Sequence, residues 1–189
     1  KWLLLVSLVV LVGSCRNENA NENEGDKSSL STFKMIVDQQ PQTYFLRDIK
    51  DYYTSIIVNQ IADGLTKLDP KTLDPIGALA ESWDVSQDGL SYTFHLRKDA
   101  YFHDHSCFKN GKGRLFDAND VKFTFELLCS KSETGEESHG YISILKETLK
   151  GAEDFFNGKT KTIEGLTVID KHTVRLETKQ KDQNFPAKL

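Results

Sequence analysis

The sequence lacks both a basic excess and an apolar run long enough to cross a bilayer. Its 189 residues carry 24 Lys and Arg against 28 Asp and Glu, a formal net charge of −4. Nucleic-acid binding draws much of its affinity from cationic side chains that neutralise phosphates, so we expect no binding of DNA or RNA. The longest apolar run, from Trp2 to Val12, is well below the roughly 20 residues that a membrane-spanning helix needs.

Signatures of catalysis are also missing. The chain has no Gly-x-Ser-x-Gly elbow, no His-Glu-x-x-His and no glycine-rich phosphate loop, so we expect neither an enzyme nor a bound cofactor. The nearest approach to a metal site is His103-Asp104-His105-Ser106-Cys107, where alternate side chains of an extended strand would point the same way. A structural zinc site needs four ligands. A fourth ligand is not evident, so we predict no metal.

The amino-terminal residues have the pattern of an export signal. Lys1 precedes the apolar run, and two small residues, Gly13 and Ser14, lead to Cys15. The run has the length of a signal peptide's apolar region, and small residues before a cysteine fit a lipobox, where the signal is cut and the thiol takes a diacylglycerol. We predict a lipoprotein signal peptide over residues 1–14 and lipidation of Cys15. A plain secretory signal with an incidental cysteine is the alternative.

Residues 15–31 follow this signal and contain almost no large apolar side chain. Such a segment cannot offset the entropy lost on ordering, so we predict a flexible tether. The alternative is that these residues form an acidic patch that binds a metal or a protein. The remaining residues, 32–189, have the size of a single domain.

Two cysteines remain besides Cys15, namely Cys107 and Cys129. An export signal sends a protein to an oxidising compartment, where paired cysteines form disulfides. The 21 residues between them would let the chain fold back along a helix. We therefore predict a disulfide between Cys107 and Cys129, with two unpaired thiols, one buried and one exposed, as the alternative.

Two helix starts are marked by capping residues. Asp51 precedes apolar residues at four-residue spacing, and Asp117 with Asp120 forms an approximate capping box before a helix that begins near Ala118. Periodicity and turn residues predict seven elements: a strand over 30–37, a helix from 51 to about 64, a turn-rich connector over 67–75, a hairpin over 83–97, a helix from about 118, a helix over 141–156, and a hairpin that pairs 166–168 with 174–176.

Specific residues within these elements resemble a known family. The clearest are residues 79–98, which read LAESWDVSQDGLSYTFHLRK, then Phe102-His103-Asp104, and residues 117–125, which read DANDVKFTF. Residues 150–159 and 163–176 add further similarity. Together these segments resemble the family 5 extracellular solute-binding proteins, which are the dipeptide, oligopeptide and nickel receptors of bacterial ABC importers.

The resemblance implies an α/β fold of the type II periplasmic-binding-protein kind, with a mixed sheet and flanking helices. Only the amino-terminal lobe is expected, because family members are bilobed receptors of several hundred residues; residues 32–189 would be the amino-terminal part of a solute-binding domain. Loops after the early strands line the cleft in this family, so Gln39 and Gln40 are expected to contact the ligand. Residues 106–114 form an insertion relative to most members.

In function, the resemblance implies a lipid-anchored receptor in the cell envelope, periplasmic or extracytoplasmic. It would close around a peptide or another small solute and deliver it to ABC permease subunits. A fold alone does not settle function. An exported lipoprotein with an enzymatic or adhesive role is therefore the alternative.

Overall fold

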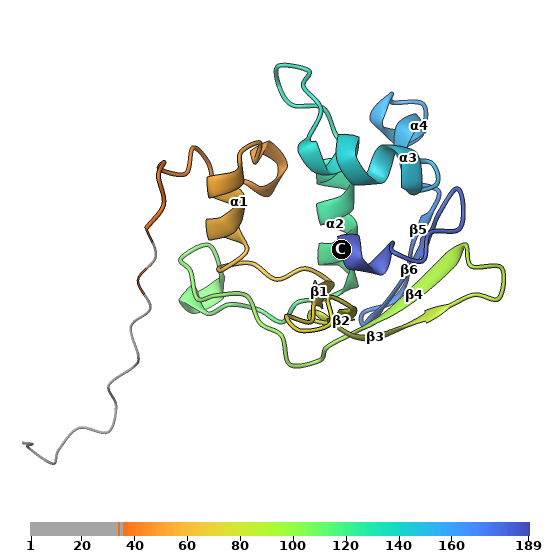
Figure 1. The fold of residues 1–189 in the computed structure, drawn as a ribbon, viewed down its shortest axis with the longest axis horizontal. Helices are drawn as coiled ribbons and strands as arrows, with labels where there is room; N and C mark the ends of the chain where they lie inside the picture. The colour runs from red at the N-terminus through yellow and green to blue at the C-terminus, as the bar shows by residue number, and fades with distance from the viewer. Residues whose placement is uncertain (1–33, 35) are drawn as a thin grey trace, which may run out of the picture. The chain divides into compact units, whose positions relative to one another are not determined.

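The computed structural model of the protein describes residue 34 and residues 36–189. The predicted signal peptide, Cys15, the tether and most of the predicted strand over 30–37 lie outside the described residues. Residues 37–189 form one unit, in which a four-stranded sheet lies against helices (Figure 1). Within the described residues, no helix is both long enough and apolar enough to cross a membrane.

The sheet consists of two hairpins that are far apart in the sequence. The first joins β3 (Ala80–Val85) to β4 (Ser91–Leu96), and the second joins β5 (Leu166–Asp170) to β6 (Thr173–Glu177). The strand order is β3-β4-β6-β5. We expected a mixed sheet, but every strand pair in the described part of the chain is antiparallel. The reason is that the sheet is made of two local hairpins, which pair with each other through β4 and β6.

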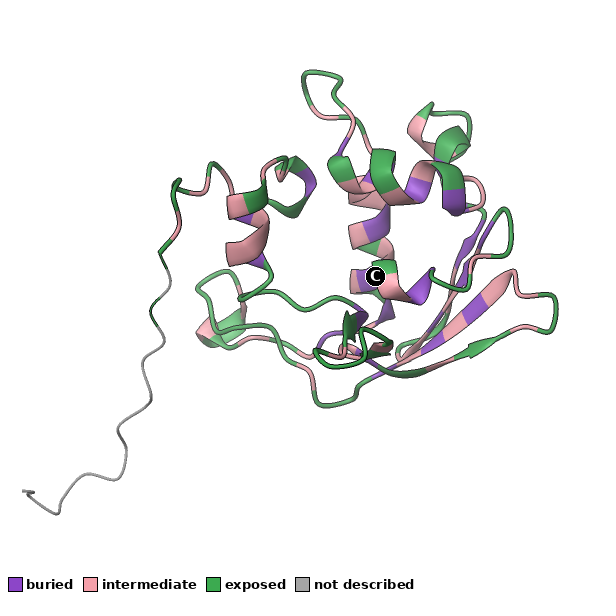
Figure 2. Ribbon diagram, in the orientation of Figure 1, coloured by how far each residue is buried: buried purple, intermediate pink, exposed green. Residues whose placement is uncertain are grey.

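Both predicted hairpins are confirmed. In β4, alternate residues are buried, and Phe94 lies opposite Val174 of β6 with neither side chain exposed to solvent. Gly89 takes a φ of 72° in the turn between β3 and β4, a conformation that glycine adopts without steric cost. Buried residues thus line the meeting of β4 and β6, and others lie on the helices (Figure 2).

Helix α2 (Ala118–Leu128) covers this sheet by contacts with β5 and β6. The predicted capping box is confirmed: the Asp117 carboxylate accepts from the backbone N–H of Asn119 at 2.8 Å, and the Asp120 carboxylate accepts from the N–H of Asp117 at 2.9 Å. Val121 and Phe125 are buried in the core. The cap thus fixes where α2 begins, and its apolar side chains give the face that meets the core.

The single helix predicted over 141–156 is wrong. The structure has a π-helical turn (Tyr141–Leu145), then α3 (Lys146–Thr148) and, after a break, α4 (Ala152–Phe156). The break arises because the backbone of Lys150 bonds to the sheet instead: its N–H donates to the carbonyl of Glu177 at 3.0 Å, and its carbonyl accepts from the N–H of Gly165 at 2.8 Å. Gly151 follows with a φ of 75°, which no helix interior contains.

The elements before the sheet are short. Helix α1 (Tyr52–Val58) begins at the predicted cap, where the Asp51 carboxylate accepts from the N–H of Thr54 at 2.8 Å, but ends earlier than expected. The predicted connector contains an antiparallel pair, β1 (Thr66–Leu68) and β2 (Pro75–Gly77). Single 3₁₀ turns complete the described elements: Leu46–Asp48, Lys109–Gly111 and Pro186–Lys188.

Two glycines with positive φ provide a matched test of the break before α4. A Cβ on Gly151 would lie 2.7 Å from both the backbone nitrogen and the Cβ of Glu164, whereas a Cβ on Gly158, at a φ of 73°, would meet nothing within 4 Å. We expect Gly158→Ala to lower the free energy of unfolding by about 1–2 kcal/mol, the cost of the left-handed conformation. Gly151→Ala should lower the free energy of unfolding by clearly more, because the clash with Glu164 adds to this strain. Urea unfolding of both variants measures the difference, and equal costs would contradict the tight packing at Gly151.

Candidate functional site

Residues 37–50, which we call the leading segment, precede α1 and carry the two glutamines predicted to contact a ligand. Gln39 and Gln40 are both exposed. Within the described residues, neither side-chain amide forms a hydrogen bond with the protein. Their donors and acceptors are therefore available to an external partner.

The leading segment is fixed to α1 by a few polar contacts. The N–H of Gln42 donates to Thr54 Oγ1 at 3.3 Å, and the Tyr53 hydroxyl donates to the carboxylate of Asp38 at 3.1 Å. Thr54 has no exposed surface. These bonds join the chain on either side of Gln39 and Gln40 to α1.

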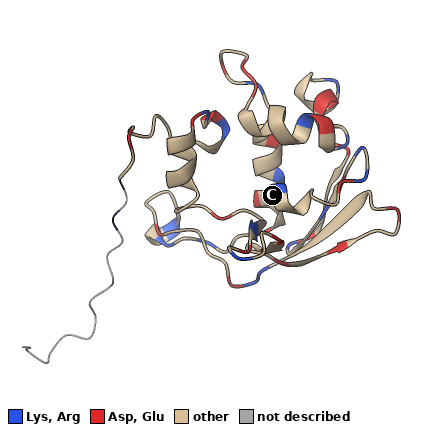
Figure 3. Cartoon of the chain, viewed as in Figure 1, with Lys and Arg blue, Asp and Glu red and all other residues tan. Residues whose placement is uncertain are grey.

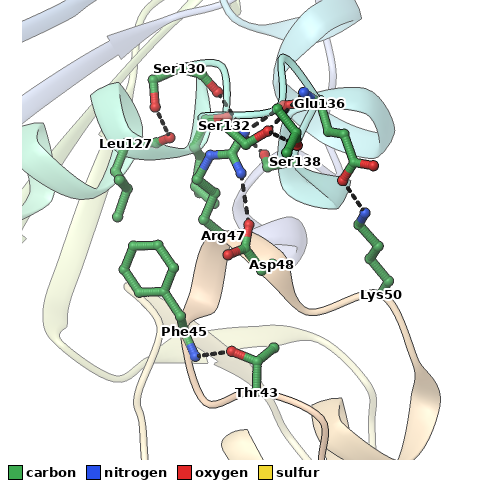
Figure 4. Close-up of polar contacts among 12 residues, drawn as sticks. Thr43, Phe45, Arg47, Asp48, Lys50, Leu127, Ser130, Ser132, Glu136 and Ser138 are labelled. Atoms are coloured by element: carbon green, nitrogen blue, oxygen red, sulfur yellow. Dashed lines mark hydrogen bonds and ion pairs between the residues drawn. The ribbon is translucent and has the colours of Figure 1, made fainter.

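Arg47 provides the main connection between the leading segment and the rest of the domain (Figure 4). Only 4% of its surface is exposed. One terminal nitrogen donates to the backbone carbonyls of Ser130 at 3.0 Å and Glu136 at 2.5 Å, and the other pairs with Asp48 at 2.7 Å. Sequence reasoning missed this residue, since its main partners are backbone carbonyls more than 80 positions away and leave no pattern in the sequence.

Several large apolar side chains of this region face solvent. Tyr44 is 61% exposed and Tyr52 of α1 is 72% exposed, with Phe45 and Leu46 about half exposed. Aromatic side chains at this density on one short stretch are common where a protein meets a partner or ligand. The distribution of charge does not indicate another binding surface, because acidic and basic residues are interspersed along the described chain (Figure 3).

The His103–Cys107 stretch does not assemble a metal site. No group of three or more His, Cys, Asp or Glu side chains that could hold a metal is found among residues 36–189. The Asp104 carboxylate accepts instead from Lys112 Nζ at 2.6 Å and from the N–H of Gly113 at 3.0 Å. These bonds lower the pKa of Asp104 and hold the inserted loop in place.

The predicted disulfide between Cys107 and Cys129 is not formed in this structure, where both thiols are free. Cys107 is exposed in the inserted loop, which is held near the start of α2 by an ion pair between Arg114 and Asp120. Cys129 lies at the other end of α2 and is fully buried, and burial raises the pKa of its thiol to about 12. The exposed Cys107 and the buried Cys129 are therefore not joined in this structure.

A surface hollow of about 330 Å³ lies between α2 and β5 and is lined by Lys122, Glu126 and residues 162–164 and 166–168. Its lining includes no residue of the leading segment. Lys122 and Glu126 also face each other at 3.8 Å, so their charges are already balanced. We place the candidate site at the leading segment because it carries two exposed glutamines and several exposed aromatic side chains.

Comparison with known proteins gives a consistent family. Residues 74–189 match the sequence model of the bacterial extracellular solute-binding proteins, family 5 (middle). Heme-binding protein A of Haemophilus influenzae is 28% identical over 99% of this chain and 34% of its own length. The oligopeptide-binding protein SarA of Streptococcus gordonii is 31% identical over 93% of this chain and 26% of its own length.

Solved structures agree with this match. The periplasmic binding protein DppA of Helicobacter pylori, solved with the peptide STSA, superposes with a TM-score of 0.61 at 27% identity, over 77% of this chain and 27% of that one. The expected type II periplasmic-binding-protein fold is thereby confirmed. The chain spans between about a quarter and a third of the length of the relatives it matches.

The contrast between the two cysteines can be tested by alkylation. We expect iodoacetamide to modify Cys107 in the native protein and Cys129 only after denaturation, because the latter thiol is buried and stays protonated at neutral pH. Peptide mapping under non-reducing conditions measures both. A Cys107–Cys129 disulfide peptide in protein purified from the cell envelope would overturn the arrangement described above.

Proposed function

Because the chain belongs to the family 5 bacterial extracellular solute-binding proteins, we propose that it is the amino-terminal part of a lipid-anchored receptor that captures peptides for an ABC importer. The observation that carries this proposal is the pair of exposed amides of Gln39 and Gln40, which form no hydrogen bond to the described residues and lie on a segment fixed by Arg47. Peptides are favoured as the solute because relatives with this fold are named for binding them.

Capture would proceed by closure of two lobes. A peptide held in a cleft offers its own backbone N–H and C=O groups, and these must be satisfied when water is excluded. Gln39 and Gln40 each supply a carbonyl acceptor and an NH₂ donor, so either can bond to a peptide backbone whatever its side chains are. The exposed rings of Tyr44 and Tyr52 would contact the solute's side chains or the opposite lobe.

Delivery would follow at the membrane. Family 5 binding proteins act outside the cytoplasm, and we propose that Cys15 anchors this one to the membrane through a diacylglycerol. A tether over residues 15–31 would leave the domain free to reach the permease subunits. The proposal assigns no chemical step to the chain, in keeping with the binding proteins it resembles.

Solute binding can be tested on the full polypeptide that contains this chain. We expect calorimetry to show binding of short peptides, and the double substitution Gln39→Ala with Gln40→Ala to weaken it about tenfold, since two modest hydrogen bonds are lost. Gln180→Ala is the matched control, because Gln180 is also exposed but lies outside the leading segment. Binding of heme without binding of peptides by the unsubstituted protein would contradict the proposed solute class.

Anchoring has its own test. We expect the protein in the membrane fraction of expressing cells to begin at a diacylated Cys15, as mass spectrometry of the amino-terminal peptide would show. Cys15→Ala should shift the protein out of the membrane fraction, while Cys107→Ala should leave it there. Recovery of an unmodified Cys15 in soluble protein would refute lipidation.

A further inference from the structure

We propose that Arg47 is a positioning residue for the solute site: it sets the leading segment, and with it Gln39 and Gln40, in place by binding the loop of residues 130–138 that follows α2. This inference rests on the proposed function for its link to the solute. The contacts themselves are independent of that function. They can be tested without any ligand.

The leading segment needs such a connection because the hydrophobic core does not hold it. The continuous core cluster, with the partly buried residues packed against it, contains no described residue before Leu65. Thr54 and Val58 of α1 are buried but lie outside that cluster. In Figure 1, α2 lies between α1 and the sheet. Polar contacts therefore carry the attachment of residues 37–64 to the core.

The 130–138 loop is itself well fixed, so a bond to it positions the segment. The Ser132 hydroxyl accepts from the N–H of Glu136 at 2.8 Å, and the N–H of Gly135 donates to the carbonyl of Ser132 at 2.9 Å. At the end of the loop, the Ser138 hydroxyl donates to the carbonyl of Leu128 at 2.7 Å. Cys129, directly before the loop, and Ser138, its last residue, are fully buried.

The guanidinium of Arg47 matches this loop in shape and charge. One of its terminal nitrogens reaches two carbonyls, of Ser130 and Glu136, that turn toward the same point (Figure 4). A planar guanidinium presents several donors in a fixed geometry, whereas a lysine ammonium is a single flexible point charge. Lys50 adds a second, exposed link to the same loop through the Glu136 carboxylate at 2.6 Å. This pair is worth little alone because water screens it.

From Arg47 the constraint passes back along the chain to the glutamines. The N–H of Asp48 donates to the carbonyl of Phe45 at 2.9 Å, and the N–H of Phe45 donates to the Thr43 hydroxyl at 3.0 Å. The N–H of Gln42 then bonds to Thr54. The chain thus has a bonded backbone group every few residues between Arg47 and Gln40, so loss of the Arg47 contacts should displace both glutamines.

The first test is hydrogen exchange on the full polypeptide, with Arg47→Met, Arg47→Lys and the control Arg97→Met. Among residues 36–189, the ion pair of the Arg97 side chain is with its near neighbour Asp99 at the surface. We expect Arg47→Met to speed exchange of the amides of residues 42–48 and 135–136, with exchange in β4 and β6 unchanged. Arg47→Lys should show a smaller effect, and Arg97→Met none in these segments. Unchanged exchange in Arg47→Met would overturn the proposal.

The second test links the contact to the solute. Arg47→Met should weaken peptide binding about fivefold, the size expected for a substitution that acts through a network, whereas Arg97→Met should bind normally. Faster exchange with unchanged affinity would refute the positioning role. If the unsubstituted protein binds no peptide, the proposed function fails while the exchange test still stands. Should Arg47→Met not fold, Ser132→Ala loosens the loop without touching Arg47, and the same two effects are expected from it.

Discussion

The pairing of β4 with β6 is the interaction on which the rest of the domain depends. It joins two hairpins that are separated by about 70 residues and places Phe94 opposite Val174, and Tyr92 opposite Leu176. Helix α2 contacts β5 and β6. Near β4, the Tyr92 hydroxyl donates to the carbonyl of Asp182 at 2.6 Å. Without this long-range register neither hairpin would bury its apolar face.

The region proposed to bind the solute, in contrast, is not held by packed apolar side chains. Residues 37–64 contribute nothing to the continuous core and are attached by hydrogen bonds, chiefly those of the buried Arg47. Segments that bind and release ligands are commonly drawn from the less stable parts of a structure. Because hydrogen bonds and not core packing hold this segment, its local opening would leave the sheet intact.

Local sequence patterns predicted the structure correctly where it depends on residues that are close together in the chain. Both hairpins follow from apolar residues that alternate over short stretches around turn residues, and the Asp117–Asp120 capping box is complete within four positions. Prediction from these patterns failed where the structure depends on hydrogen bonds to backbone groups that are distant in the chain. The helix break at Lys150 depends on the carbonyl of Glu177, and the role of Arg47 depends on carbonyls of Ser130 and Glu136, none of which a local pattern reveals. The predicted disulfide is also not formed in this structure, since the number of residues between two cysteines does not determine whether their side chains meet.

The most direct measurement is a crystal structure of the full polypeptide grown with a bound peptide. We expect the peptide's backbone to lie within hydrogen-bonding distance of the side chain of Gln39 or Gln40, with Arg47 still bonded to the carbonyls of Ser130 and Glu136. A peptide bound at a site that makes no contact with residues 37–50 would contradict the assignment of the leading segment to solute capture.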